Sequence, residues 1–231
     1  MIIRPSVEVI ELPGTDCPVA IVDGFAAAPE RWREQAMGGD YDYRGDFYPG
    51  QRKPVDPAYF QDIGQRLGAI MRSVFGCRKS LRVDRALYSL VSTQPDQLSL
   101  AQCIPHIDDV APGSYAMVHY LAHTAFGGTA FGGTAFYRQR STGFAQVAAT
   151  QHRTYLAALE TDLADHGRPE PGYIQGDTLA FSQIGSVDFA YNRAVIYPGN
   201  LLHCSIVPAG VAHPDNPLTG RLTIAGFFHA D

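Results

Sequence analysis

The chain carries a histidine and an aspartate at a spacing that lets both bind one metal ion. His106 and Asp108 lie in the segment PHIDD. In an extended chain, residues i and i+2 point the same way, so one imidazole nitrogen and one carboxylate oxygen can reach the same ion. A third donor, His203, follows a strand and a turn in the segment RAVIYPGNLLHCS. Two histidines and one carboxylate, with coordination positions left open, form the facial triad of non-haem Fe(II) sites.

A late segment, RLTIAGFF, offers groups that would hold an anionic ligand. Arg221 and Thr223 are again two residues apart and share one face of an expected strand. Arginine forms a bidentate pair with a carboxylate, and a threonine hydroxyl can donate a further hydrogen bond. This pair fits a dicarboxylate cosubstrate.

The order of these motifs resembles that of a known family. HxD, then one late histidine, then Arg-x-Thr on the last strand, is similar to the Fe(II)/2-oxoglutarate-dependent dioxygenases, and most of all to their prolyl-4-hydroxylase-like group. The segments AIVDGFAAAPERW and GGTAFYR also resemble that group. The resemblance implies that Fe(II) binds His106, Asp108 and His203, and that 2-oxoglutarate binds Arg221 and Thr223. It further implies hydroxylation of an amino acid, a peptide side chain or a small metabolite, with dioxygen consumed and succinate and carbon dioxide released.

Five more residues are candidates for contacts around the metal. Tyr88, in RALYSL, matches a tyrosine that often contacts 2-oxoglutarate in the family that the chain resembles. Residues after the GGT segment and before the late histidine are candidates for substrate contacts, namely Tyr137, Arg138, Asn192 and Arg193. For the two arginines, a surface or intrachain ion pair is the alternative.

The surrounding sequence predicts a mainly β protein with flanking helices. From residue 81 onward, short β-branched or aromatic segments are broken by Gly, Pro, Asn or Asp, which is typical of strands. The 23 glycines and 16 prolines agree with many turns. The resemblance implies a double-stranded β-helix, the jelly roll of cupins. We expect a single domain over residues 1–231, with 1–80 as an N-terminal support of strands and helices and 81–231 as the jelly-roll core.

Three helices are predicted, near residues 29–37, between Asp56 and Gly76, and as an insert near 150–165. The apolar face of the third is expected to consist of Leu156, Leu159 and Leu163. A Gly/Tyr/Asp-rich loop is expected over 38–51. This loop and the third helix could close over the site as lids or be ordinary surface elements.

Composition excludes several classes of function. The net charge of −5 argues against a nucleic-acid-binding protein and against a polybasic membrane surface. No apolar run reaches the roughly 18 residues of a membrane span, and the first residues lack a signal-peptide pattern. These features predict a cytoplasmic protein with four reduced cysteines. Cys204 follows a candidate ligand directly, and strand alternation predicts that its sulfur faces away from the metal.

Some alternatives remain open at the level of sequence. A cupin-type metalloprotein, such as an isomerase or a dioxygenase that needs metal alone, would use the same three ligands without 2-oxoglutarate. A non-enzymatic binding module with a decayed site is a third interpretation. The repeated TAFGG at 124–133 is interpreted as a duplication that lengthens one hairpin. The sequence leaves the substrate and the oligomeric state open.

Overall fold

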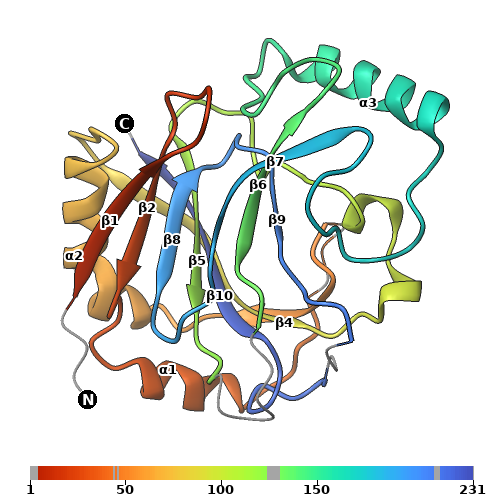
Figure 1. Ribbon diagram of the computed structural model, residues 1–231. Helices are drawn as coiled ribbons and strands as arrows, with labels where there is room; N and C mark the ends of the chain where they lie inside the picture. Colours follow the sequence, from red (N-terminus) through yellow and green to blue (C-terminus); the bar gives the residue numbers. More distant parts are fainter. Residues whose placement is uncertain (1–4, 44, 46, 124–130, 211–213, 231) are drawn as a thin grey trace.

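The computed structural model describes residues 5–43, 45, 47–123, 131–210 and 214–230, which form two antiparallel sheets and three α-helices (Figure 1). Two short 3-10 helices, η1 (Pro95–Gln97) and η2 (Leu100–Gln102), precede the HxD segment. Residues 124–130, most of the TAFGG repeat, lie outside the described part. The predicted mainly β class is confirmed. No helix in the described ranges is long and apolar enough to cross a membrane.

The larger sheet contains seven strands with β10 near its middle. Along the sheet the order is β1 (Ser6–Glu11), β2 (Pro18–Asp23), β8 (Ala194–Pro198), β5 (Ser114–Tyr120), β10 (Leu222–Ala230), β4 (Leu81–Val91) and β3 (Gly50–Pro54). β10 pairs antiparallel with both β4 and β5, so that Thr223 lies between Ser89 and Tyr120. The chain's last strand is therefore held on both sides.

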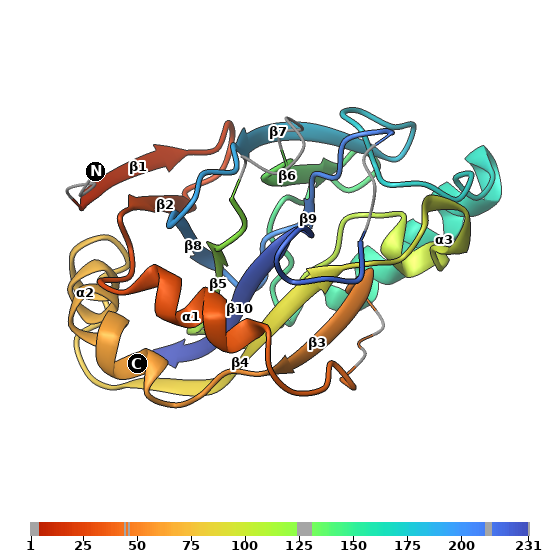
Figure 2. The same cartoon turned by 90° about the horizontal axis from the view of Figure 1, so that it is seen from below.

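A smaller sheet lies against one face of the larger one. Its order is β7 (Phe181–Val187), β6 (Thr134–Gln139) and β9 (His203–Ser205). Phe136 of β6 packs with Tyr120 and Tyr197 of the larger sheet in one apolar cluster. Figure 2 shows the smaller sheet on one side of the larger sheet, and α1 and α2 on the other side. The space between the two sheets is where side chains from β5, β6, β8, β9 and β10 meet.

The first two helices match the prediction closely. α1 (Pro29–Ala36) buries Trp32 and Ala36, and α2 (Tyr59–Ser73) buries Tyr59, Ile63, Leu67, Ile70 and Met71. These side chains share one apolar cluster with Ile224 and Phe228 of β10. The amphipathic pattern of both helices thus covers the outer face of the larger sheet.

The third helix forms where it was expected, with its buried face rotated relative to the predicted leucine face. α3 (His152–His166) ends before Gly167, whose φ of 81° suits glycine. Its buried residues are Tyr155 and Asp162, whereas Leu156 is 43% exposed. Asp162 accepts hydrogen bonds from Gln139 Nε2 at 2.9 Å and Ser141 Oγ at 2.8 Å. These contacts to β6 and the turn after it fix the rotation of α3. Of the three leucines predicted as its apolar face, Leu159 packs against the cluster that contains Tyr155, Leu163 is half-buried and Leu156 is exposed.

One strand was missed in the sequence. The interval expected to be a loop over 38–51 runs into β3, which pairs antiparallel with β4. Its sequence GQRKP lacks β-branched and aromatic residues, so only the pairing with β4 makes it a strand. At Gly50, a Cβ atom would lie 2.0 Å from the carbonyl oxygen of Leu90, which is why glycine stands at this close approach.

Candidate metal centre

The three predicted metal ligands lie together at the inner face of the smaller sheet. Ligand atoms of His106, Asp108 and His203 all lie within 4.8 Å of one another. Asp108 Oδ2 is 3.4 Å from His203 Nε2, and Asp108 Oδ1 is 4.0 Å from His106 Nε2. The two imidazole centroids are 4.5 Å apart. This separation of donors fits the coordination sphere of one divalent ion.

Backbone hydrogen bonds set this geometry. His106 and His203 form an isolated antiparallel bridge, in which each N–H donates to the other residue's carbonyl, at 3.0 and 2.9 Å. The N–H of Asp108 donates to the Gly199 carbonyl at 2.8 Å. The HxD segment therefore lies outside the named strands, as a single bridge beside β9. Its extended course still turns residues 106 and 108 to the same side.

The orientation of His203 leaves its Nε2 facing the other ligands. Its Nδ1 lies 2.8 Å from the Leu201 carbonyl oxygen, which can only accept, so Nδ1 carries the proton and Nε2 offers its lone pair. Tyr197 lies against this ring with centroids 4.7 Å apart, and Phe47 stacks on His106 at 5.5 Å. A backbone carbonyl behind a histidine is the usual outer support of a metal ligand.

The charges around the three ligands also suit a cation. Burial lowers the pKa of His106 well below its ordinary 6.5, and the nearby His203 and Arg52 lower it further. His106 is therefore neutral at pH 7, which is the form that binds a metal. Burial raises the pKa of Asp108, although His203 and the arginines oppose that shift. A buried carboxylate is costly without a cation, and a divalent ion would relieve that cost.

Arg221 is buried close to this cavity without an acidic partner. Only 4% of the residue is exposed, and no carboxylate of the described residues forms an ion pair with it. Its Nε and Nη2 donate to the carbonyls of Gly132 and Gly133 at 3.1 and 2.8 Å. Thr223, on the same face of β10, lines the cavity with the metal ligands. A buried guanidinium without a counter-charge is unfavourable, so the position fits an anionic ligand.

Tyr88 lies on the other face of the larger sheet. It pairs with Ile224, and both belong to the apolar cluster under α1 and α2. In this orientation Tyr88 points away from the cavity in which the contact with 2-oxoglutarate was predicted. Strand alternation is the physical reason, since the neighbouring residue Ser89, not Tyr88, shares the face of Thr223.

A tyrosine that the sequence did not single out, Tyr48, occupies the place expected of Tyr88. Its buried hydroxyl lies beside Arg221 and within reach of the Thr223 hydroxyl, and no described residue accepts its proton at full hydrogen-bond geometry. Burial raises its pKa, so the phenol keeps its proton and can donate it to an acceptor. Arg52 of β3 lies over the Tyr48 ring at 4.0 Å and also lines the cavity. The aromatic content of the 38–51 interval was the only sequence signal for this residue.

The structure places the four candidate substrate residues away from the cavity. Tyr137 is buried in the apolar cluster under α3, on the outer side of the smaller sheet. Arg138 donates to the carbonyls of Pro13, Gly14 and Gly143. Arg193 forms a bidentate ion pair with Asp23 at 2.6 and 3.0 Å.

Asn192 holds a buried network instead of a substrate. Its Oδ1 accepts from the Ala26 N–H at 2.9 Å and lies 3.0 Å from His119 Nε2. The other ring nitrogen of His119 lies 2.9 Å from the Tyr59 hydroxyl. These partners satisfy the polar atoms of Asn192 within the fold, and none of the four candidate substrate residues lines the cavity of the metal ligands.

Cys204 turns away from the metal ligands. It pairs with Ala135 of β6, and both lie in the cluster on the outer side of the smaller sheet. His203 pairs with Phe136, which faces the larger sheet. Burial raises the pKa of the Cys204 thiol to about 12. A protonated thiol on the other face of β9 is not a metal ligand.

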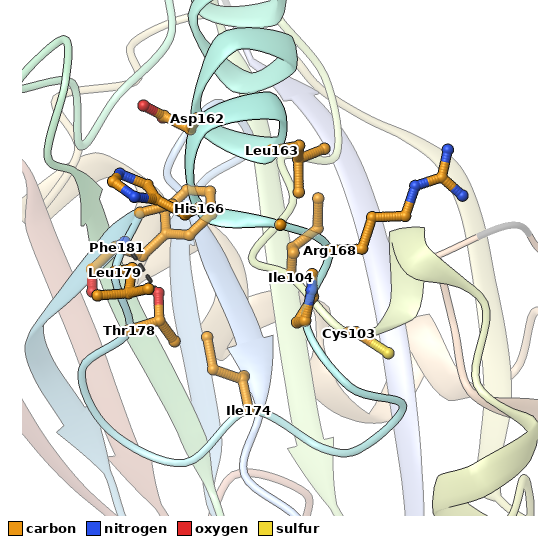
Figure 3. A pocket seen from close by; sticks show the side chains of 13 residues that line it. Cys103, Ile104, Asp162, Leu163, His166, Arg168, Ile174, Thr178, Leu179 and Phe181 are labelled. Carbon is orange, nitrogen blue, oxygen red and sulfur yellow. Dashed lines mark hydrogen bonds between the residues drawn. The ribbon is translucent and has the colours of Figure 1, made fainter.

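Two further pockets flank α3. One, of about 240 Å³, lies between α3 and the HxD segment, and His106 is among its lining residues. The other, of about 290 Å³, lies at the C-terminal end of α3 (Figure 3) and contains none of the three metal ligands. Leu163 and Ile104 line both. Of these two pockets, only the first joins α3 to a candidate metal ligand.

Distant structural likenesses are found among solved structures. HygX from Streptomyces hygroscopicus, with nickel, 2-oxoglutarate and hygromycin B bound, gives a TM-score of 0.48 at 15% identity, over 92% of this chain and 82% of HygX. SnoN, a non-heme alpha-ketoglutarate-dependent epimerase from nogalamycin biosynthesis, gives 0.48 at 11% identity, over 92% and 77%. These likenesses are too distant to assign a function or a site.

The sequence comparisons place the chain in one family. No curated protein matches the chain. The model of DUF6445, described as a family of unknown function, matches residues 3–228. The protein belongs to the DUF6445 family.

Proposed function

We propose that this protein is an oxygenase that uses Fe(II) and 2-oxoglutarate. The observation that carries the proposal is the shared cavity of His106, Asp108 and His203 with Thr223, next to the buried and unpaired Arg221. A metal-binding triad alone would fit any cupin-type metalloprotein. A buried arginine without an acid, at the side of the same cavity, favours an anionic cosubstrate.

The residues present fit both groups. Two neutral imidazoles and a carboxylate are the donor set of Fe(II) sites with open positions. The Tyr48 hydroxyl and Arg221 offer donors to a carboxylate. The Thr223 hydroxyl donates to the Ser89 carbonyl at 3.3 Å and would turn from it to donate to the ligand. In this proposal the triad holds Fe(II), and these three residues hold the distal carboxylate of 2-oxoglutarate. When bound, Fe(II) and 2-oxoglutarate supply the activation of dioxygen, with release of succinate and carbon dioxide.

The chain's own groups orient and shield this chemistry. The Leu201 carbonyl keeps the proton of His203 on Nδ1, so Nε2 stays free as a donor to the metal. The rings of Phe47 and Tyr197 cover His106 and His203 and limit the access of water. Halogenases related to the Fe(II)/2-oxoglutarate-dependent dioxygenases lack the carboxylate that Asp108 supplies here. We therefore propose hydroxylation of an amino acid, a peptide side chain or a small metabolite.

We also propose that the two sheets form a double-stranded β-helix. Two antiparallel sheets pack face to face, with the candidate ligands between them. We interpret them as the two halves of a double-stranded β-helix, within a single domain over residues 1–231. The packing of β10 against both α2 and the inner cavity supports this interpretation, because the N-terminal support and the core share one cluster.

Succinate formation tests the proposed function. The protein is incubated with Fe(II), 2-oxoglutarate and dioxygen, with and without a panel of amino acids, peptides and small metabolites. We expect succinate that depends on Fe(II) and rises with at least one member of the panel, and none with His203→Ala. A protein that binds Fe(II) but forms no succinate under any of these conditions would instead be a metal-only cupin.

A further inference from the structure

A second arginine at the cavity has no ion pair with any carboxylate of the described residues. Arg52 lines both the metal cavity and an outer pocket of about 240 Å³. Its Nε is buried without a hydrogen-bond partner in the described ranges, and none of their carboxylates forms an ion pair with it. Asp108 is the acidic residue that interacts electrostatically with Arg52, and in the proposed site its carboxylate binds the metal. Among the described residues, Arg52 therefore has donors left for another anion.

The outer pocket contains a second positively charged side chain besides Arg52. It is lined by Arg85 as well as Arg52, together with His106 and Asp108. Arg85 lies over the Phe227 ring at 4.4 Å and has no ion-pair partner among the described acidic residues. Two guanidinium groups beside the candidate metal favour an anionic substrate, because arginine binds carboxylates with paired, charge-assisted hydrogen bonds.

An apolar pocket opens from the same place. The pocket of about 240 Å³ along α3 shares Phe47, His106 and Ile107 with the outer pocket. Its other walls are mostly apolar and include the leucines of α3, namely Leu156, Leu159 and Leu163, with Ile104. Since a cavity of about 150 Å³ can hold benzene, this volume accepts a phenyl ring or a short alkyl chain.

The arginines of the outer pocket and the apolar pocket along α3 together indicate what the leucines of α3 bind. The helix turns Tyr155 and Asp162 into the protein, which leaves Leu156 43% exposed at the pocket. We infer that the substrate of the proposed oxygenase is a small carboxylic acid with an apolar group, whose carboxylate binds Arg52 and whose apolar group lies against the leucines of α3. This inference rests on the proposed function and names its substrate class.

Binding to a protein that cannot turn over tests the inference. Calorimetry with Ni(II)- and 2-oxoglutarate-loaded protein compares 3-phenylpropanoate, N-acetylphenylalanine, 4-methylpentanoate and octanoate with their methyl esters. We expect at least one acid to bind about tenfold to a hundredfold more tightly than its ester, as one charge-assisted contact allows. If no acid binds more tightly than its ester, the inference is wrong.

Variants show which residues are responsible. Arg52→Gln should remove the preference for the acid over the ester, and Arg52→Lys should retain part of it. Leu156→Ser should weaken the acid and its ester alike. Matched controls are Arg72→Gln, on an exposed part of α2, and Leu179→Ser, which is 69% exposed and lines only the pocket of Figure 3. An unchanged preference in Arg52→Gln, with an unchanged melting temperature, would overturn the assignment of Arg52.

The two proposals fail in different ways. Loss of 2-oxoglutarate binding in Arg52→Gln would mean that Arg52 holds the cosubstrate, and it would also overturn the inference. If the wild-type protein does not bind 2-oxoglutarate at all, the proposed function fails first. If it binds 2-oxoglutarate and no acid is preferred over its ester, only the substrate class is wrong.

Discussion

Replacing Arg221 with alanine should separate cosubstrate binding from metal binding. The guanidinium is buried, and in the proposed site its carboxylate partner would be buried with it. Truncating one partner of such a charge pair costs about 2–5 kcal/mol. At about 1.4 kcal/mol per factor of ten, the affinity for 2-oxoglutarate should fall roughly 30-fold to several thousand-fold. The affinity for the metal should be unchanged, because Arg221 is not a ligand.

The same substitution also has a cost in folding stability. Arg221 donates to the carbonyls of Gly132 and Gly133, and its removal leaves both without these donors. The Gly133 carbonyl still accepts from the Ile206 N–H at 3.0 Å, so of the two only the Gly132 carbonyl is left without a donor from the described residues. One buried carbonyl left unpaired costs about 1–3 kcal/mol of unfolding free energy. Arg221→Lys keeps the charge but loses the planar fork, so it should be intermediate in both properties.

Calorimetric titration of 2-oxoglutarate into Ni(II)-loaded protein measures the loss of affinity directly. Thermal unfolding of each variant is recorded beside it, and the Ni(II) content confirms that the metal site is intact. An Arg221→Ala protein that is folded, binds Ni(II) and binds 2-oxoglutarate as tightly as the wild type would refute the role given to Arg221.

Three further predictions concern single side chains. Tyr48→Phe should weaken 2-oxoglutarate binding by about 1.5–3 kcal/mol, the value of one hydrogen bond to a charged group. The matched Tyr88→Phe, on the other face of the sheet, should leave that affinity unchanged, and equal effects in the two variants would contradict the role given to Tyr48. Asp108→Asn should abolish Fe(II) binding, measured by metal analysis. It should raise the melting temperature of the metal-free protein, because burial disfavours the charged carboxylate, and a lower melting temperature would contradict this reasoning. Burial lowers the pKa of His119 from 6.5 to about 4, so the unfolded chain takes up its proton first as the pH falls. Stability should therefore decrease by about 3 kcal/mol between pH 6.5 and 4, and denaturant unfolding of His119→Gln should show a smaller decrease; an equal decrease would show that other groups are responsible.

The grouping of His106, Asp108 and His203 could be predicted from local rules. The i, i+2 alternation of an extended chain holds for the HxD segment even though only one bridge, His106 to His203, fixes it. The same rule places Arg221, directly before β10, on the side of Thr223. Alternation also explains why Tyr88 does not face the cavity. Its face depends on which residue of β4 pairs with Thr223, and that register is set by contacts across the sheet.

Other features depend on partners far away in the sequence. Arg193 pairs with Asp23, and Asn192 binds Ala26, so neither is available at the cavity. The rotation of α3 follows from Asp162, which accepts a hydrogen bond from Gln139 of β6. Such pairs carry no local signal, whereas the apolar periodicity of α1 and α2 does.

The missed strand explains the missed residues. β3 has the sequence GQRKP, and its pairing with β4 brings Arg52 to the cavity. Tyr48 precedes β3 by two residues, in the interval expected to be a loop. Neither residue has a fixed spacing from the HxD motif, so no motif could have identified them.

The central claim is that this chain binds Fe(II) and 2-oxoglutarate together in one site. Anaerobic titration of 2-oxoglutarate into the Fe(II)-loaded protein tests it most directly, because a bidentate 2-oxo acid on Fe(II) gives a metal-to-ligand charge-transfer band in the visible spectrum. The account predicts a band that saturates at one equivalent per chain and is absent in His203→Ala. A protein that binds one Fe(II) per chain and shows no such band at saturating 2-oxoglutarate would contradict it.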